Sequence, residues 1–478
     1  MSMAPEHAAG GGPGMQPDGT RNTVVTYPWE STPIPLPDAP APTPVPRYLY
    51  LLSLFLIGLA FIRLLPNSNP LSTGLTMGRL YEAGLLIVGL GVVPAVLLLR
   101  GYVLRPRLSE QLPLLAFCGW ATLSMVWSDS PMLSLSKAVQ LGFIVFGAAL
   151  FAAAFAEIRR SPYDFANMLA LALTGLVFVG LIANTFIWGS PFAMRGLDGS
   201  RPRLLFGYSH PIEFADLASF ALIAWLVSRF PWQWKLIAAS FLLYIHHQTD
   251  ARMSMAAILL TLLAMFLIRS GPRMRLFVAF VAGYAVLAYF LVITFGPRPD
   301  KPFAPFVALM PSDAQSLNGR RGLWAVAMER FDQSPLTGVG FYASRFTLMP
   351  RFEWAGDTHN AWIETLLTTG LVGFALLLVV IALSFAVALR TNDLLLASVL
   401  IYVLLTTYTA APLIAPKLPT VMLLICLNEA LSRLPLPQAA PWPDAPSLPW
   451  SVPRGVLTAA RGHHAQDAAS AATSTHGQ

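Results

Sequence analysis

Polar side chains of catalytic types gather in one stretch of this chain, residues 318–374, within an otherwise apolar sequence. The stretch holds two helix-like segments with a Gly-rich turn between them, and the second segment runs into a long apolar run. Its candidate site residues are Arg320, Arg321, His359, Asn360 and Glu364. His359 is the best candidate for a general base, because an unperturbed imidazole has a pKa of about 6.5 and exchanges protons near neutral pH.

Glu364 falls a little more than one helical turn after His359. Its carboxylate could act with His359 in catalysis by orienting it, could pair with an arginine, or could make a purely structural hydrogen bond. Arg320 and Arg321 could bind substrate, or they could contact lipid phosphates beside an interfacial helix. The sequence leaves these alternatives open.

Further cations stand next to other apolar segments. Arg203 and His210 follow one such segment, and Arg252 begins another. Three arginines in one cavity would suit a pyrophosphate, because each guanidinium offers a planar fork of donors and keeps its charge. The predicted substrate-binding residues are therefore Arg203, Arg252, Arg320, Arg321, His210 and Asn360.

A metal site is the alternative use of the polar residues in these loops. His210, His246, His247 and Asp250 are of ligating types, but nothing in their spacing enforces a site. The outer loops also contain no D-x-D pair that would hold a divalent cation. We therefore predict that the protein uses neither a metal nor another cofactor.

The elements that must position these side chains are membrane helices. Hydrophobic residues make up 55% of the 478 residues and charged residues 12%, with a mean hydropathy of +0.59. This composition excludes a soluble globular fold and predicts an all-α polytopic membrane protein of about twelve spans. The apolar segments lie at residues 48–65, 78–99, 111–127, 136–156, 165–188, 211–229, 233–249, 253–269, 275–295, 364–389, 393–411 and 413–431.

The orientation follows from basic residues in short loops. Arg100, Arg159 and Arg273 follow the second, fourth and eighth segments, which predicts that the even-numbered loops are cytoplasmic. Both termini are then cytoplasmic, and the candidate site residues face outward. The Pro-, Gly- and Ala-rich ends, residues 1–46 and 434–478, are predicted to be disordered tails around a transmembrane catalytic domain of residues 47–433. A larger outward loop, residues 296–363, would carry short interfacial helices.

A set of spaced motifs resembles a known family. In order, the chain reads R-x-x-x-W from Arg320, S-P-x-x-G-x-G from Ser334, H-N-x-x-x-E from His359 and G-x-x-G from Gly370. This order resembles the bacterial O-antigen ligase and the O-antigen and exopolysaccharide polymerase superfamily. The resemblance implies a GT-C-like architecture in the bacterial inner membrane, with an active site that faces the periplasm.

The same resemblance implies transfer of a glycan from an undecaprenyl (polyprenyl) pyrophosphate carrier to an acceptor hydroxyl. Expected partners are this donor, a glycan or lipid acceptor, membrane lipids, and flippase and chain-length regulator proteins, but no nucleic acid. A single displacement without metal would invert the anomeric centre. Polymerase and ligase share the motifs, so both stay open. The alternative is a transporter or flippase for a lipid-linked or anionic substrate, although transporters bind near the bilayer midplane and not in a long outer loop.

Overall fold

The computed structural model describes residues 46–61, 77–195, 203–204, 211–269, 320–352, 355–408 and 415–434, all within the compact unit Pro44–Pro437. The predicted tails lie outside the described residues, apart from Pro46 and Leu434, as does the predicted span 275–295. Every regular element described is a helix except one pair of two-residue strands. In that pair β1 (Met194–Arg195) runs antiparallel to β2 (Arg203–Leu204), with Arg195 opposite Arg203.

Each predicted span in the described part of the chain coincides with a helix. The longer helices and their bounds are α1 Arg47–Leu59, α2 Met77–Leu99, α3 Leu112–Leu123, α4 Pro131–Ala156, α5 Asp164–Trp188, α6 Pro211–Val227, α7 Trp232–Gln248, α8 Arg252–Arg269, α14 Ala361–Thr391, α15 Leu394–Thr406 and α16 Leu418–Ser432. Two short 3-10 helices, Ser109–Gln111 and Ser124–Val126, flank α3. The remaining helices, α12 (Arg320–Gln333) and α13 (Ser344–Leu348), precede α14.

Five of these helices are long and apolar enough to cross a membrane: α2, α4, α5, α8 and α14. The predicted class of polytopic helical membrane protein is therefore supported, whereas the number of twelve spans stays a prediction. The outward sides of these helices carry large apolar side chains, such as Phe186, which is 86% exposed, and Phe266, which is 63% exposed. Such side chains are expected where a helix faces lipid instead of water.

Several predicted boundaries were wrong, and the following three are examples. Helix α4 begins at Pro131 and not at residue 136, because proline is well placed in the first turn, where its missing N–H leaves no helical bond unmade. Helix α3 ends at Leu123, and a 3-10 turn replaces the rest of the predicted span. The predicted span 364–389 begins earlier, at Ala361, and is interrupted at Gly370, whose φ of 65° and ψ of −169° are not helical.

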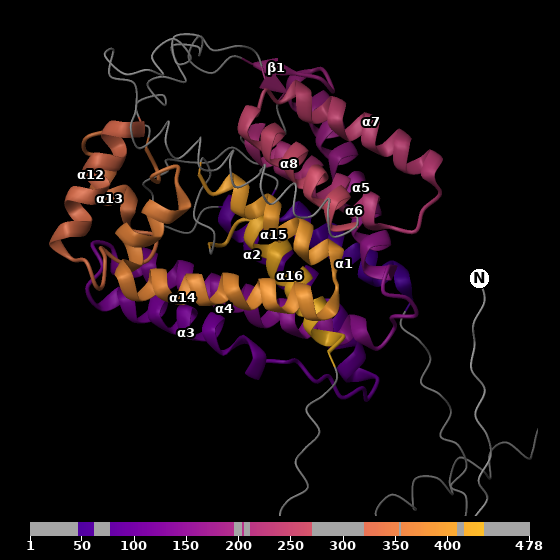
Figure 1. Cartoon of the computed structure of the whole chain (residues 1–478), viewed down its shortest axis with the longest axis horizontal. Helices are drawn as coiled ribbons and strands as arrows, with labels where there is room; N and C mark the ends of the chain where they lie inside the picture. The colour runs from indigo at the N-terminus through magenta and orange to yellow at the C-terminus, as the bar shows by residue number, and fades with distance from the viewer. Residues whose placement is uncertain are drawn as a thin grey trace, which may run out of the picture. The chain divides into compact units, whose positions relative to one another are not determined.

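Helices that are distant in sequence pack side by side in the core. Helix α16 packs on α4, α14 on α3, and α15 on α8, while α5 contacts both α1 and α6 (Figure 1). An aromatic cluster joins α1, α4 and α5. Tyr50 of α1 meets Phe151 and Phe155 of α4 edge-on, and Phe155 meets Phe165 of α5. Non-local pairs of this kind fix the order of the helices around the core.

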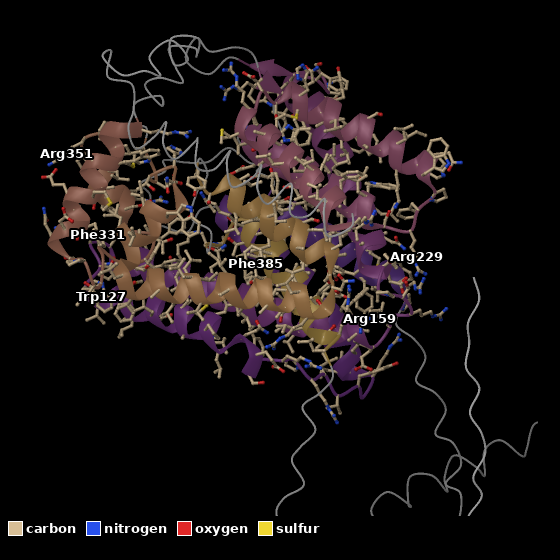
Figure 2. The ribbon with its side chains drawn as sticks, viewed as in Figure 1. Trp127, Arg159, Arg229, Phe331, Arg351 and Phe385 are labelled. Carbon is tan, nitrogen blue, oxygen red and sulfur yellow. The ribbon has the colours of Figure 1, made fainter. Side chains whose placement is uncertain are left out.

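Polar contacts between the connections that join consecutive helices fall into two groups. We number the connections by the predicted apolar segment that each one follows. Described connections with even numbers belong to one group, and those with odd numbers belong to the other. One group joins the described even-numbered connections with the start of α1 and the end of α16: Arg159 bonds Glu429, Arg433 pairs with Asp393, Gln111 bonds Asn428, Asn167 bonds Arg229 and Arg47 pairs with Asp164. We call this group the Glu429 end. Figure 2 labels Arg159 and Arg229 among its side chains.

The other group joins the odd-numbered connections, and we call it the His359 end. The backbone of Asp129 bonds Val339, that of Ala361 bonds Thr407, and Arg203 pairs with Asp250. Trp127, Phe331 and Arg351 in Figure 2 belong to this group and lie on the opposite side of the view from Arg159 and Arg229. Successive helices therefore run between the two ends, as alternate membrane crossings require. Which end faces the cytoplasm stays a prediction.

Candidate functional site at the His359 end

Asn360 starts helix α14. Its φ of −150° and ψ of 113° are extended, and its side-chain Oδ1 accepts hydrogen bonds from the backbone N–H groups of Trp362 at 3.0 Å and Ile363 at 3.2 Å. This is an N-cap, which satisfies two donors that the first turn of a helix leaves without partners. Capping accounts for the residue type at this position, whereas the predicted contact with substrate stays a prediction.

Glu364 is buried, with 3% of its surface exposed. One carboxylate oxygen accepts from the backbone N–H of Thr358 at 2.9 Å, and the other accepts from the hydroxyl of Ser344 in α13. The carbonyl of Thr358 in turn accepts from the indole N–H of Trp324 in α12 at 2.9 Å. Side chains from three helices thus fix the peptide just before His359. Of the roles predicted for Glu364, the structural hydrogen bond agrees with these contacts.

His359 has a left-handed backbone, with φ at 50°, which is uncommon for a residue other than glycine. Asp357 helps to hold this conformation, because its Oδ1 accepts from the backbone N–H of His359 at 2.9 Å. The same Oδ1 lies 3.3 Å from Nδ1 of the imidazole. The other oxygen of Asp357 accepts from Nζ of Lys417 at 3.3 Å. The His359 side chain keeps 35% of its surface exposed, so it is reachable from outside the fold.

Sequence reasoning missed Asp357 and Lys417. Asp357 had a signal, because an aspartate two residues before another residue often bonds that residue's backbone N–H in an Asx turn. The sequence contains almost no signal for Lys417, because this residue lies 60 residues further along the chain, in the connection before α16. Only the fold brings these two charges together.

The charges around His359 determine its protonation. Burial lowers the pKa of His359, and the cations Arg320 and Lys417 lower it further, while Asp357 raises it; the result lies below the ordinary value. Burial raises the pKa of Asp357, but Lys417 and His359 outweigh this effect and hold that pKa below its usual range. Burial lowers the pKa of Lys417, yet Asp357, Tyr342 and Glu213 hold it above its usual range. At neutral pH the group is therefore a neutral imidazole beside an ionised Asp–Lys pair.

Arg320 is the first residue of α12, and its effect on the pKa of His359 places it within electrostatic reach of the imidazole. The side chain of Arg321 lies outside the described residues. Helix α12 lies in the outward loop that was predicted to carry short interfacial helices, but its Leu323 and Ala327 are fully buried in a small core with Val339 and Leu367. These apolar side chains pack within the protein, and contact of α12 with lipid stays a prediction.

Arg203 and Arg252 are brought together by one carboxylate. Nε of Arg252 lies 3.4 Å from Oδ1 of Asp250, and Nε of Arg203 lies 4.0 Å from Oδ2. Asp250 has a φ of 47° in the turn between α7 and α8. Nε of Arg203 is buried and makes no hydrogen bond. His210, predicted to belong to the same site, lies outside the described residues.

The two charged groups lie at the same end of the helices. Glu213, in the first turn of α6, raises the pKa of Lys417, so α6 starts near the Asp357 group. One turn on, Asp216 accepts from the hydroxyl of Tyr402 in α15 at 2.7 Å and from that of Ser254, near the start of α8, at 3.5 Å. A single cavity lined by both groups stays a prediction. Within the described residues, no three His, Cys, Asp or Glu side chains form a group that could hold a metal ion.

The Gly-rich turn of the S-P-x-x-G-x-G motif has a structural task. It packs against the interruption of α14, where Val339 N–H donates to the Leu367 carbonyl at 2.8 Å and Gly340 N–H to that of Thr368 at 3.0 Å. Leu371 N–H donates back to the carbonyl of Pro335 at 2.8 Å. These bonds satisfy backbone groups that the break in the helix exposes. The turn thereby fixes α14 at its interruption, in the part of the helix that follows the His359 loop.

Together the fold and the site define a class: a helical, multi-pass membrane protein with a histidine and several arginines at one polar end. Residues 237–378 match the family model described as O-antigen ligase. The chain is also similar to the exopolysaccharide production protein ExoQ of Rhizobium meliloti (strain 1021), at 29% identity over 290 residues, which cover 56% of this chain and 63% of the relative. The match thus spans less than two thirds of the relative. Both findings confirm the resemblance to the O-antigen ligase and polymerase superfamily.

Proposed function

We propose that this protein transfers a glycan from a polyprenyl pyrophosphate carrier to an acceptor hydroxyl at the periplasmic face of the bacterial inner membrane. The observation that carries the proposal is the neutral, partly exposed imidazole of His359, which is held by Asp357 near Arg320 at the start of a candidate membrane span. The matched O-antigen ligase region contains all three residues. The donor, acceptor, flippase and chain-length regulator named from the sequence are the partners of this reaction.

His359 would act as the general base. A proton on Nδ1, facing Oδ1 of Asp357, places the basic lone pair of the imidazole on Nε2. Nε2 takes the proton of the acceptor hydroxyl while the hydroxyl oxygen attacks the anomeric carbon. The bond between that carbon and the pyrophosphate oxygen breaks, and the pyrophosphate leaves with the electron pair. One displacement of this kind inverts the anomeric centre.

The arginines would stabilise the leaving group. Negative charge grows on the pyrophosphate as the glycosidic bond breaks, and guanidinium groups fixed in place stabilise it without reorganisation. Arg203 and Arg252 stand together at Asp250, and Arg320 stands near His359. Arg321, His210 and Asn360 are the further contacts that we propose for the donor. This arrangement needs no divalent cation.

The test is transfer by the purified protein in lipid nanodiscs, supplied with a polyprenyl pyrophosphate glycan and an acceptor. We expect His359→Ala to lower turnover about 100-fold or more, the usual scale for loss of a general base, while the donor still binds. Arg390→Ala is the control, because Arg390 is exposed in the last turn of the same helix, away from the His359 end. A His359→Ala protein with a near-normal rate would remove the base from the mechanism.

The same purified protein can be used to test whether it is a transferase or, as the alternative proposes, a transporter or flippase. If the wild-type protein forms no glycosidic bond in nanodiscs but moves a lipid-linked glycan across the bilayer of a liposome, then it is a flippase. For a transferase, the glycans of a deletion strain distinguish the two reactions. Loss of a polymerase leaves single repeat units, whereas loss of a ligase leaves long chains on the carrier.

A further inference from the structure

Asp357 contacts His359 and Lys417 through different carboxylate oxygens. Oδ1 lies 3.3 Å from Nδ1 of His359, and Oδ2 accepts from Nζ of Lys417 at 3.3 Å. The Asp357 side chain is 21% exposed and that of Lys417 is 34% exposed, so water screens this pair only in part. The contact ties the loop before α14 to the connection before α16.

The geometry of Asp357 follows from this division. A carboxylate that contacts a histidine alone is free to rotate and strongly favours the imidazolium, because an opposite charge within about 4–6 Å raises the pKa of the histidine. A lysine on the second oxygen opposes both effects: it fixes the plane of the carboxylate and balances its charge. The imidazole then keeps its orienting partner without becoming a permanent cation.

We propose that Lys417 is a positioning residue: it holds Asp357 against His359 and offsets the charge of that carboxylate, so that His359 receives the acceptor proton as a neutral base. This inference rests on the proposed function. Lys417 itself need not touch the acceptor or the donor. Among the described residues, the other charged or titratable groups that face this site are Arg320 from α12, Tyr342 from the turn before α13, Glu213 and Asp216 from α6, and Glu364 from α14.

The experiment is the pH profile of kcat/KM for transfer by Lys417→Met and Lys417→Arg. A base works only when it is neutral, so the rate falls as pH drops through the pKa of His359. Without the lysine charge, Asp357 holds the imidazolium more firmly, and that pKa rises. We expect the acid limb of Lys417→Met to move to higher pH by about one unit, the lower end of the effect of a close charge. Lys417→Arg should leave the limb in place.

The shape of the profile separates positioning from a general loss of structure. In Lys417→Met the rate should recover toward that of the wild type above the shifted limb, which damage to the fold would not allow. Arg390→Met serves as the matched control, because it removes an exposed cation from the far end of α14.

Two results would overturn the inference. An acid limb of Lys417→Met that coincides with the wild type would show that the lysine does not act through His359. A raised KM for the donor with an unmoved limb would make Lys417 a donor contact instead. These results differ from failure of the proposed function. In that case His359→Ala itself would transfer at a near-normal rate, whereas here it lowers turnover about 100-fold or more and only the Lys417 variants disagree.

Discussion

At the scale of single residues, bridging carboxylates explain how so many cations share one end of the molecule. Asp250 lies between Arg203 and Arg252, and Asp357 lies between His359 and Lys417. Asp250 reduces the repulsion between two guanidinium groups, and Asp357 offsets the charge of the Lys417 ammonium group beside the imidazole. Asp250 itself has a left-handed backbone, and Asp357 lies two residues before His359, which has one. The cations are therefore gathered before any anionic substrate arrives.

Arg252→Lys tests whether the guanidinium fork matters beyond its charge. Lysine keeps the charge, but all its donors are on one nitrogen atom and cannot form the two parallel hydrogen bonds of a guanidinium fork. One charge-assisted hydrogen bond to the pyrophosphate is therefore lost. Such bonds contribute about 1.5–3 kcal/mol, which corresponds to a loss of about 10- to 100-fold in kcat/KM. Both kcat and donor KM should suffer, because a clamp touches the phosphate before and during the reaction. Equal kinetics for Arg252→Lys, Arg390→Lys and the wild type would exclude the clamp.

At the scale of elements, the interruption of α14 shapes the site. The first part of the helix, which carries the Asn360 cap and Glu364, packs in the small core with α12 and α13. The second part, Leu371–Thr391, still has about 20 residues, the length that a membrane crossing needs. If this second part is the crossing, His359 stands about three helical turns beyond it. The sequence instead predicted a span at residues 364–389, which begins five residues after His359.

Gly370→Ala should therefore destabilise the protein. The φ of 65° and ψ of −169° belong to a region that is essentially restricted to glycine, and a Cβ would lie 2.2 Å from the carbonyl oxygen of Leu336. We expect a loss of at least about 1–3 kcal/mol, seen as a lower thermal midpoint of the detergent-solubilised protein. Gly142→Ala in α4 is the control, since a Cβ there meets open space. A midpoint unchanged by Gly370→Ala would mean that the turn and the helix do not pack as described.

The sequence predicted some of these elements and could not predict others. Long apolar runs in the sequence predicted helices such as Pro131–Ala156 and Leu418–Ser432. A backbone in lipid must satisfy its own hydrogen bonds, which leaves it few other structures. The interruption at Gly370 was missed, since glycine is also compatible with close helix packing, and only the Pro335–Gly340 turn reveals why the helix breaks there. His359 was predicted as a site residue from the sequence, whereas Lys417 comes next to Asp357 only through tertiary folding.

At the scale of the whole molecule, the alternation of polar ends is the strongest support for a multi-pass fold. Among the described residues, odd-numbered connections contact one another at the His359 end, and even-numbered ones at the Glu429 end. Helices as short as α1 and α15 follow this alternation even though they are shorter than a usual span. Because every described site residue lies at the His359 end, one measurement of its sidedness decides the compartment of the whole proposed reaction.

Cysteine labelling provides that measurement. Ser109→Cys, at the Glu429 end before α3, and Gln333→Cys, at the last residue of α12, are exposed positions. The two native cysteines, Cys118 and Cys426, are both buried, so background labelling should be low. In cells with a permeable outer membrane, an impermeant maleimide should modify Gln333→Cys directly, and Ser109→Cys only after the inner membrane is opened, because basic loops stay in the cytoplasm. The reverse pattern would place His359 in the cytoplasm and end the proposal of periplasmic transfer.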